Sequence, residues 1–125
     1  MSPNIVIVED DSSVSKAIVR LLGVAGFQAV AFGSAEAFLE SVTGRQFDCL
    51  ILDINLPGLS GLELYDQVVT DAGVPVPVIF ITAHDKSAAR VKMDRDGTVT
   101  CLSKPFHART LIGAVRKNLA IAHSA

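Results

Sequence analysis

The sequence lacks an apolar run long enough to cross a bilayer, although 50% of its 125 residues are hydrophobic. The first residues, Met1 to Asn4, contain no basic stretch leading into an apolar segment, so no signal peptide is visible. We therefore expect a soluble, cytoplasmic protein that does not enter a membrane. At this length we expect one domain, residues 1–125, whose core needs neither a metal nor a disulfide.

The sequence also lacks a strong excess of charge of either sign. The formal net charge is -2, and the 11 Lys and Arg residues are scattered along the chain. Proteins that bind nucleic acid directly usually gather basic residues on one face or along one helix. Direct binding of nucleic acid by this chain is therefore not expected.

What the sequence does contain is a regular alternation of strand and helix patterns. The strands are expected near residues 4–8, 28–32, 48–53, 78–82 and 99–103. Such alternation is typical of a parallel sheet covered by helices on both faces. Because right-handed crossovers leave few topologies, we expect a flavodoxin-like α/β fold, a doubly wound (βα)5 sheet with strand order 2-1-3-4-5.

Cysteine is scarce, and the two residues present have no metal-ligand spacing. Cys49 and Cys101 each lie in a segment predicted to be a buried strand, so both are expected to be small core residues. In the expected strand order a third strand separates them, which is too far for a disulfide.

Capping residues and apolar stripes predict the helix boundaries. The first helix is expected to begin with Ser12 or Ser13 as its N-cap and to end at Gly26. Ser34 is expected to cap the second helix. The remaining helices are predicted near residues 61–71, 85–94 and 107–122. The fourth has only two large apolar residues to hold it against the sheet, so we predict that it is mobile.

Polar residues follow four of the predicted strands at the same end. They are the acidic cluster Glu9-Asp10-Asp11, Asp53, Thr82 and Lys104. In open parallel sheets functional groups lie at the carboxyl ends of the strands, and the switch point of the expected order lies between strands one and three. Each residue alone has a structural explanation as a cap, a turn or a surface residue. Four such positions at one sheet edge predict a functional site.

The carboxylates of this edge predict a metal site. Three or more carboxylates that converge within a few ångströms repel one another unless a cation neutralises them. Because the available ligands are oxygens, with no His or thiolate, we expect Mg2+, with Mn2+ as the alternative. Asp10 and Asp53 are the expected side-chain ligands, and the backbone carbonyl of Asn55 is a candidate for a third.

The same residues predict a phosphoryl-transfer chemistry. An Asp beside a magnesium ion can attack phosphorus and form an aspartyl phosphate, and Asp53 is the candidate nucleophile. Lys104 would oppose the charge of the phosphoryl oxygens, while the Thr82 hydroxyl and the backbone amide of Ala83 would donate hydrogen bonds. Since phosphoryl transfer needs mainly positioning and charge neutralisation, no separate general base is required.

Four motifs stand in order along the chain, and together they resemble those of a known family. They are Val8-Glu9-Asp10-Asp11-Ser12, Asp53-Ile-Asn-Leu-Pro57-Gly58-Leu-Ser-Gly61, Thr82-Ala83 and Lys104-Pro105-Phe106. Their order and spacing resemble the receiver domain of bacterial two-component response regulators, of the chemotaxis-regulator type, over the whole length. The resemblance implies that Asp53 accepts a phosphoryl group from the phosphohistidine of a sensor kinase. It also implies that Asp10 contacts the metal, that Glu9 acts through water and that the Lys104–Pro105 bond is cis.

The resemblance further implies how the site signals. In similar domains the phosphoryl group draws in the Thr hydroxyl, here Thr82, and an aromatic residue of the last strand turns inward. This changes the face of the fourth helix, fifth strand and fifth helix, where partners bind. Cys101 stands where the family usually has Tyr or Phe, which leaves Phe106 and the fourth helix as an alternative route. Asn55 and His84 stand at positions that tune the lifetime of the acyl phosphate in similar proteins.

The implied partners are proteins. They are a sensor histidine kinase or phosphotransfer protein, a downstream effector protein or domain, and a second copy in a homodimer that forms on phosphorylation. The chain would catalyse only its own phosphorylation and dephosphorylation, so it is not expected to be an enzyme. A stand-alone regulator and the receiver part of a longer protein both remain open.

Other functions fit part of the pattern. A haloacid-dehalogenase-like phosphatase uses a similar Asp, Thr and Lys, but it carries an acid/base Asp where this chain has Asn55, and this chain has no substrate-capping insertion. A degenerate receiver would bind partners without phosphorylation; the complete set of site residues argues against it, and Cys101 keeps it open. A flavodoxin-type nucleotide carrier is disfavoured because the loop after the first strand is acidic.

Overall fold

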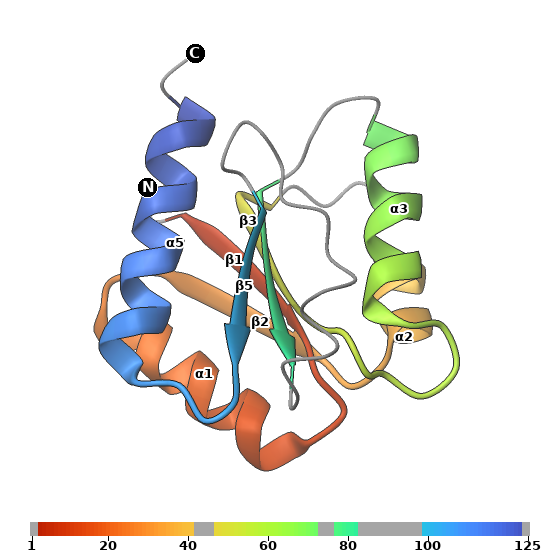
Figure 1. The fold of residues 1–125 in the computed structure, drawn as a ribbon, viewed down its shortest axis with the longest axis horizontal. Helices are drawn as coiled ribbons and strands as arrows, with labels where there is room; N and C mark the ends of the chain where they lie inside the picture. Colours follow the sequence, from red (N-terminus) through yellow and green to blue (C-terminus); the bar gives the residue numbers. More distant parts are fainter. Residues whose placement is uncertain (1–2, 42–46, 73–76, 83–98, 124–125) are drawn as a thin grey trace.

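The computed structural model describes residues 3–41, 47–72, 77–82 and 99–123. These residues form a five-stranded parallel sheet flanked by helices (Figure 1). The strand order is β2-β1-β3-β4-β5, which confirms the predicted doubly wound α/β fold. The predicted fourth helix with its mobility, and the predicted site residues Ala83 and His84, lie outside the described residues.

The strands lie where the apolar runs predict them. Their bounds are β1 Asn4–Val8, β2 Gln28–Phe32, β3 Cys49–Asp53, β4 Val78–Thr82 and β5 Val99–Ser103. Every residue of β3 and β4 is buried, because helices cover both faces of these interior strands. β2 and β5 are the edge strands, and both are partly exposed.

Helices cover both faces of the sheet. Their bounds are α1 Ser12–Val24, α2 Ala35–Ser41, α3 Gly61–Ala72 and α5 Ala108–His123. α1 and α5 lie on one face, whereas α2 and α3 lie on the other (Figure 1). Alternate strand residues point to opposite faces, so Leu50 and Leu52 pack in the α2 and α3 layer, while Cys49 and Ile51 pack in the α1 and α5 layer. In the described part of the chain, no helix combines the length and apolar character needed to cross a membrane.

The register of the interior strands determines which polar residues meet at the carboxyl edge. β1 pairs with β3 so that Val8 lies opposite Leu52. The next residues, Glu9 and Asp53, therefore leave the sheet side by side. On the other side of β3, Asp53 lies opposite Ile81, which places Thr82 one residue beyond it on β4.

Two of the predicted helix caps can be checked directly. The N-cap of α1 is Asp11, whose Oδ1 accepts hydrogen bonds from the backbone amides of Ser13 at 2.9 Å and Val14 at 3.3 Å. The prediction of Ser12 or Ser13 is therefore wrong, because both already lie inside the helix. Ser34 caps α2 as predicted, since its Oγ accepts a hydrogen bond from the amide of Ala37 at 3.0 Å.

The charged residues of the helices separate by sign between the two faces of the sheet. Those of α1 and α5 are all basic, namely Lys16, Arg20, Arg109, Arg116 and Lys117. Those of α2 and α3 are all acidic, namely Glu36, Glu40, Glu63, Asp66 and Asp71. The expectation of scattered basic residues is wrong for this part of the molecule, because α1 and α5 are distant in sequence but in contact in the fold.

A buried polar group lies at the amino end of β4. Asn118 of α5 is fully buried, and its Nδ2 donates a hydrogen bond to the carbonyl oxygen of Val78 at 3.1 Å. Its Oδ1 accepts a hydrogen bond from the Thr100 hydroxyl of β5 at 3.1 Å. Asn118 therefore links α5 to two neighbouring strands through neutral hydrogen bonds.

The two cysteines lie on strands separated by β4, as predicted, and both are free thiols. Cys49 is fully buried in β3, whereas Cys101 on β5 is only half-buried. Burial raises the pKa of the Cys49 thiol to about 12, and it also raises the pKa of Cys101. The prediction of a core residue is thus confirmed for Cys49, while Cys101 is more exposed because β5 is an edge strand.

Candidate functional site

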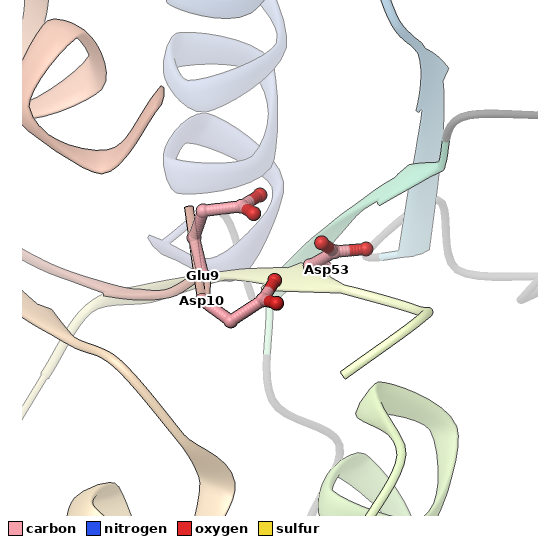
Figure 2. A group of neighbouring side chains, drawn as sticks. All are labelled: Glu9, Asp10 and Asp53. Atoms are coloured by element: carbon pink, nitrogen blue, oxygen red, sulfur yellow. The ribbon is translucent and has the colours of Figure 1, made fainter. Parts of the chain in front are cut away.

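The predicted acidic residues converge at the carboxyl ends of β1 and β3. Glu9 and Asp10 extend from the end of β1 towards Asp53 at the end of β3 (Figure 2). One carboxylate oxygen of each lies within 4.8 Å of the others. Glu9 and Asp53 are only 1% and 5% exposed, whereas Asp10 is exposed. The group is therefore buried on its protein side and open to solvent at Asp10.

Lys104, directly after β5, joins this group from the other side. Its Nζ donates a hydrogen bond to Glu9 Oε2 at 3.0 Å and lies 3.5 Å from Asp53 Oδ2. The backbone amide of Lys104 donates to the carbonyl oxygen of Thr82 at 2.7 Å, and the Lys104–Pro105 bond is cis, as the resemblance implies. The ammonium thus contacts two of the three carboxylates, and negative charge is in excess when all three are ionised.

This crowding shifts the proton equilibria of the group. Burial raises the pKa of Glu9 to about 7, although the hydrogen bonds from Lys104 and from the Asp11 amide act in the opposite direction. For Lys104, burial lowers the pKa, but the hydrogen bond to Glu9 and the charge of Asp53 outweigh it, so its pKa lies above the usual value. The ammonium is therefore retained, while Glu9 holds a proton more readily than an ordinary glutamate does. A divalent cation would favour the ionised form of Glu9.

Asp53 is held by its own loop. The backbone amide of Asn55 donates a hydrogen bond to Asp53 Oδ1 at 2.9 Å, while Oδ2 faces Lys104. The side chain of Asn55 is exposed. Thr82 is fully buried at the end of β4, and Ile81 before it pairs with Asp53. The predicted residues Asp53, Glu9, Asp10 and Lys104 are in one group, with Thr82 on the adjacent strand end.

The oxygen-only donor set fits a hard divalent cation. Three carboxylates with mutually close oxygens, one of them exposed, are the ligands that Mg2+ prefers, and an exposed ligand leaves room for water. No His or Cys belongs to the group among the described residues. The carboxylate ligands present at this edge therefore suit the predicted Mg2+.

Asp11, the third acidic residue after β1, has a different role from its neighbours. Its Oδ1 accepts hydrogen bonds from the Ser13 hydroxyl at 2.6 Å and from two backbone amides of α1. These hydrogen bonds, with that of the hydroxyl the largest, lower the pKa of Asp11. Asp11 is therefore a helix cap that keeps its charge, rather than a further ligand.

The loop between β3 and α3 is shaped by a glycine whose role the sequence did not reveal. A Cβ atom at Gly61 would lie 2.2 Å from the Asp53 carbonyl oxygen, so a larger residue cannot fit without moving the backbone. The Gly61 amide donates a hydrogen bond to the carbonyl oxygen of Ile54 at 3.1 Å. The first turn of α3 therefore packs directly against the end of β3 and holds Asp53 in place.

Two further contacts hold the same loop, and sequence reasoning missed both. Ser60 and Glu63 form a capping box, in which each side chain accepts a hydrogen bond from the backbone amide of the other, at 3.2 and 3.3 Å. A Ser followed three residues later by Glu was the signal that could have revealed it. Glu36 of α2 accepts a hydrogen bond from the Leu59 amide at 3.3 Å, and this contact across 23 residues leaves no local signal.

Cys101 and Phe106, the two residues singled out for signalling, belong to opposite layers. Cys101 packs with the α2 and α3 layer, next to Phe80 of β4, whose ring contacts that of Tyr65 at 5.4 Å between centroids. Phe106 packs with the α1 and α5 layer. Phe106 therefore does not occupy the space that an aromatic residue at position 101 would reach.

Comparison with known proteins places this site in context. The sequence profile of the family described as "Response regulator receiver domain" matches residues 5–116. Nodulation protein W of Bradyrhizobium diazoefficiens is 40% identical over 109 residues, which are 87% of this chain and 48% of that protein. Response regulator protein TmoT of Ectopseudomonas mendocina is 36% identical over 118 residues, 94% of this chain and 53% of that protein.

A solved structure supports the same assignment. The low-resolution structure of the response regulator StyR superposes with a TM-score of 0.79 and 34% identity, and the match covers 97% of this chain and 61% of that one. The present chain thus spans about half the length of the curated relatives it matches.

Proposed function

The chain belongs to the response regulator receiver domain family, and from this premise we propose that it accepts a phosphoryl group on Asp53 from the phosphohistidine of a sensor histidine kinase or phosphotransfer protein. One observation carries the proposal. The carboxylate oxygens of Glu9, Asp10 and Asp53 lie within 4.8 Å of one another, with the Lys104 ammonium between Glu9 and Asp53. This arrangement has the nucleophile, the acidic metal ligands and the cation that aspartyl phosphorylation needs.

The proposed metal is Mg2+, held by Asp10 and Asp53, with the backbone carbonyl of Asn55 as a third ligand and Glu9 acting through water. When bound, Mg2+ would neutralise the excess negative charge of the carboxylates and that of the incoming phosphoryl oxygens. Mn2+ has the same ligand preferences and is expected to replace it.

In the proposed reaction an oxygen of Asp53 attacks phosphorus, and the bond between phosphorus and the imidazole nitrogen of the donor breaks. Asp53 is well suited to this because burial shields it from water while the Asn55 amide fixes one of its oxygens. Lys104 then pairs with the phosphoryl oxygens, and its partly exposed side chain is close enough to Asp53 to do so. The Thr82 hydroxyl and the Ala83 amide donate hydrogen bonds to the same oxygens.

Hydrolysis of the acyl phosphate returns Asp53 to its carboxylate form. We assign Asn55 and His84 to the control of its rate, through access of the attacking water. The chain thus acts on itself and turns over no separate substrate.

The output that we propose is a change in protein contacts. The face formed by the fourth helix, β5 and α5 would meet an effector protein or domain, or a second phosphorylated copy. Cys101 cannot make the bulky rotation of an aromatic residue, so Thr82 is expected to act through the backbone after β4 instead. The proposed location is the cytoplasm.

Intact-mass measurement with Mg2+ and acetyl phosphate tests the proposal. Wild type should gain the mass of one phosphoryl group, and Asp53→Asn should not. Asp66→Asn, which changes an exposed carboxylate of α3, is the matched control and should gain the same mass as wild type. A gain that persists in Asp53→Asn would reject Asp53 as the acceptor.

The presence of Cys101 favours a second candidate, a degenerate receiver that signals without phosphorylation. It would bind Mg2+ through the same carboxylates but show no mass gain with acetyl phosphate. Steady turnover of a small phosphoester such as p-nitrophenyl phosphate would instead support the phosphatase alternative.

A further inference from the structure

An apolar groove runs between α1 and α5, on the basic side of the molecule. It has a volume of about 460 Å³ and is lined by Arg20, Leu21, Val24, Ala25, Ala108, Arg109, Ile112, Gly113 and Arg116. Six of these nine residues are apolar or glycine, and the other three are arginines. Val24 is 86% exposed, the greatest exposure of any large hydrophobic residue in the described part of the chain. Such a strongly exposed apolar side chain beside an apolar groove is typical of a binding surface.

The three arginines of the groove are available to a ligand. Each is exposed, and none makes an ion pair or side-chain hydrogen bond with another described residue. No acidic residue occurs in α1 or α5 to pair with them. The groove therefore combines an apolar floor with guanidinium groups that lack carboxylate partners within the described structure.

On the α1 side the groove lies far from the acidic site, whereas on the α5 side Ala108 comes four residues after Lys104. α1 begins at Ser12, next to the site, and Val24 lies twelve residues further on, about 18 Å along the helix axis. The residues that line the groove include none of those that hold the metal or the phosphoryl group.

We propose that this groove binds an acidic amphipathic helix of a partner protein. Apolar side chains spaced three and four residues apart on that helix would seat between α1 and α5, against Val24 and Ile112. Asp or Glu residues flanking this stripe would pair with Arg20, Arg109 and Arg116, whose planar guanidinium groups suit carboxylates. Binding does not require phosphorylation of Asp53.

A second copy of the chain fits the groove poorly. Its acidic surface on α2 and α3 has the complementary charge, but the only large hydrophobic residues counted as exposed in the described part are Val24 itself and Val30 of β2. The acidic helices thus offer no apolar ridge to fill the groove. Contact between the basic side of one copy and the acidic side of the next would also be head-to-tail, and such contacts form rings or open chains rather than two-fold dimers.

Nucleic acid fits the groove poorly as well. Ligands of that class are held by basic residues along the phosphate backbone and by aromatic residues that stack on bases. The lining contains no aromatic residue, and its floor is aliphatic. An apolar floor is better matched by the aliphatic face of a helix.

Binding of a designed peptide tests the proposal. The probe is a fluorescently labelled helical peptide with a Leu stripe flanked by Glu, and the control peptide has Lys in place of each Glu. Backbone amide shifts of the 15N-labelled protein report the site, and fluorescence anisotropy gives the affinity. The groove variants are Val24→Asp and Arg109→Glu with Arg116→Glu. Lys16→Glu, an exposed cation of α1 outside the lining, is the matched charge control.

The expected result is that the Glu peptide shifts the amides of Leu21, Val24, Ile112 and Gly113. Its affinity should fall at least about tenfold in the groove variants, fall with rising salt and stay within about twofold in Lys16→Glu. Asp53→Asn should bind it as wild type does, which separates this proposal from the phosphoryl-transfer function. The groove variants and Lys16→Glu should still bind Mg2+, which shows that they fold.

Three results would overturn the proposal. The first is equal binding of the Glu and Lys peptides, or no shift of the groove amides with either. The second is a shift of the same amides with protein concentration alone, which would assign the groove to self-association. The third is a shift with a DNA duplex or with phosphatidylglycerol vesicles when the Glu peptide produces none.

Discussion

The two ends of β4 are equally buried but lie beside different kinds of polar group. At the amino end, Asn118 is neutral, and its amide donates to Val78 and accepts from Thr100. At the carboxyl end, Thr82 lies beside three carboxylates from the ends of β1 and β3, which share a single ammonium, and one of them is open to solvent. The first group is satisfied within the protein and holds elements together. The second has unbalanced charge, which is neutralised either by a proton on Glu9 or by a cation from outside.

The comparison predicts opposite responses to mutation at the two ends. Changes at the amino end should lower stability and leave ligand binding intact. Changes at the carboxyl end should remove ligand binding at little cost to the metal-free fold.

The largest effect is expected for Asp53→Asn. The Asn side chain still accepts the Asn55 hydrogen bond but removes one of the three charges, so Mg2+ affinity should fall by at least about tenfold. Titration calorimetry measures this loss. In thermal unfolding, Mg2+ should stabilise wild type and no longer stabilise the variant, while the metal-free variant should be as stable as metal-free wild type or more so. A metal-free variant that is clearly less stable would contradict the distinction between the two ends.

Asn118→Ala should produce the reverse pattern. The change leaves the Val78 carbonyl and the Thr100 hydroxyl without their partner and opens a cavity, which should lower the free energy of unfolding by about 2–4 kcal/mol. Urea unfolding measures this. Lys117→Ala, at the exposed neighbouring position, should change stability by less than about 0.5 kcal/mol. The stabilisation by Mg2+ should survive in Asn118→Ala, and its loss would show that the two ends are coupled.

Gly61→Ala should affect both stability and function, because Gly61 packs against the backbone of Asp53. The added methyl group would lie 2.2 Å from the Asp53 carbonyl oxygen, so the loop must move, at a cost of about 1–3 kcal/mol. The rate of phosphorylation by acetyl phosphate should fall by about tenfold or more. Gly23→Ala in α1, where a Cβ meets no atom within 4 Å, should instead stabilise by about 0.5–1 kcal/mol. Equal behaviour of the two variants would remove the role assigned to Gly61.

The smallest effect is a pH dependence that only the charged end should show. Burial raises the pKa of Glu9 from 4.5 to about 7. Between these values the folded protein holds a proton that the unfolded chain has released, so the free energy of unfolding should fall as the pH rises from 4.5 to about 7. Mg2+ favours the ionised carboxylate, so binding at pH 6 should release up to about one proton.

Calorimetry of Mg2+ binding in two buffers of different ionisation enthalpy measures that release. Glu9→Gln should abolish it, and Asn118→Ala should leave it unchanged. Release of the same size in Glu9→Gln would assign the proton to another group.

Much of the acidic site could be predicted from the sequence, because its residues directly follow strands that are easily identified as apolar runs. β3 and β4 are continuous apolar runs, so the positions of Asp53 and Thr82 at their ends follow directly. The strand order then brings Glu9 next to Asp53, which needs only the topology of right-handed crossovers.

The neutral end could not be predicted in the same way. Asn118 is a polar residue within the otherwise apolar stripe of α5, and its partners on β4 and β5 lie 40 and 18 residues away. The cap of α1 was misplaced because Asp11, Ser12 and Ser13 are all good N-caps, and the choice depends on where β1 ends. The separation of charges between the helix layers has no signal in the sequence, because it arises only when α1 and α5 come together in the fold.

That separation has a consequence for how the domain meets other molecules. Five cations on one side of the sheet and five anions on the other give the described helices a large electric dipole moment, although the net charge of the chain is only -2. The electric field of an approaching charged surface exerts a torque on such a dipole, so the domain turns before the two molecules touch. The isoelectric point of the chain gives no hint of this orientation, which salt in the buffer would abolish.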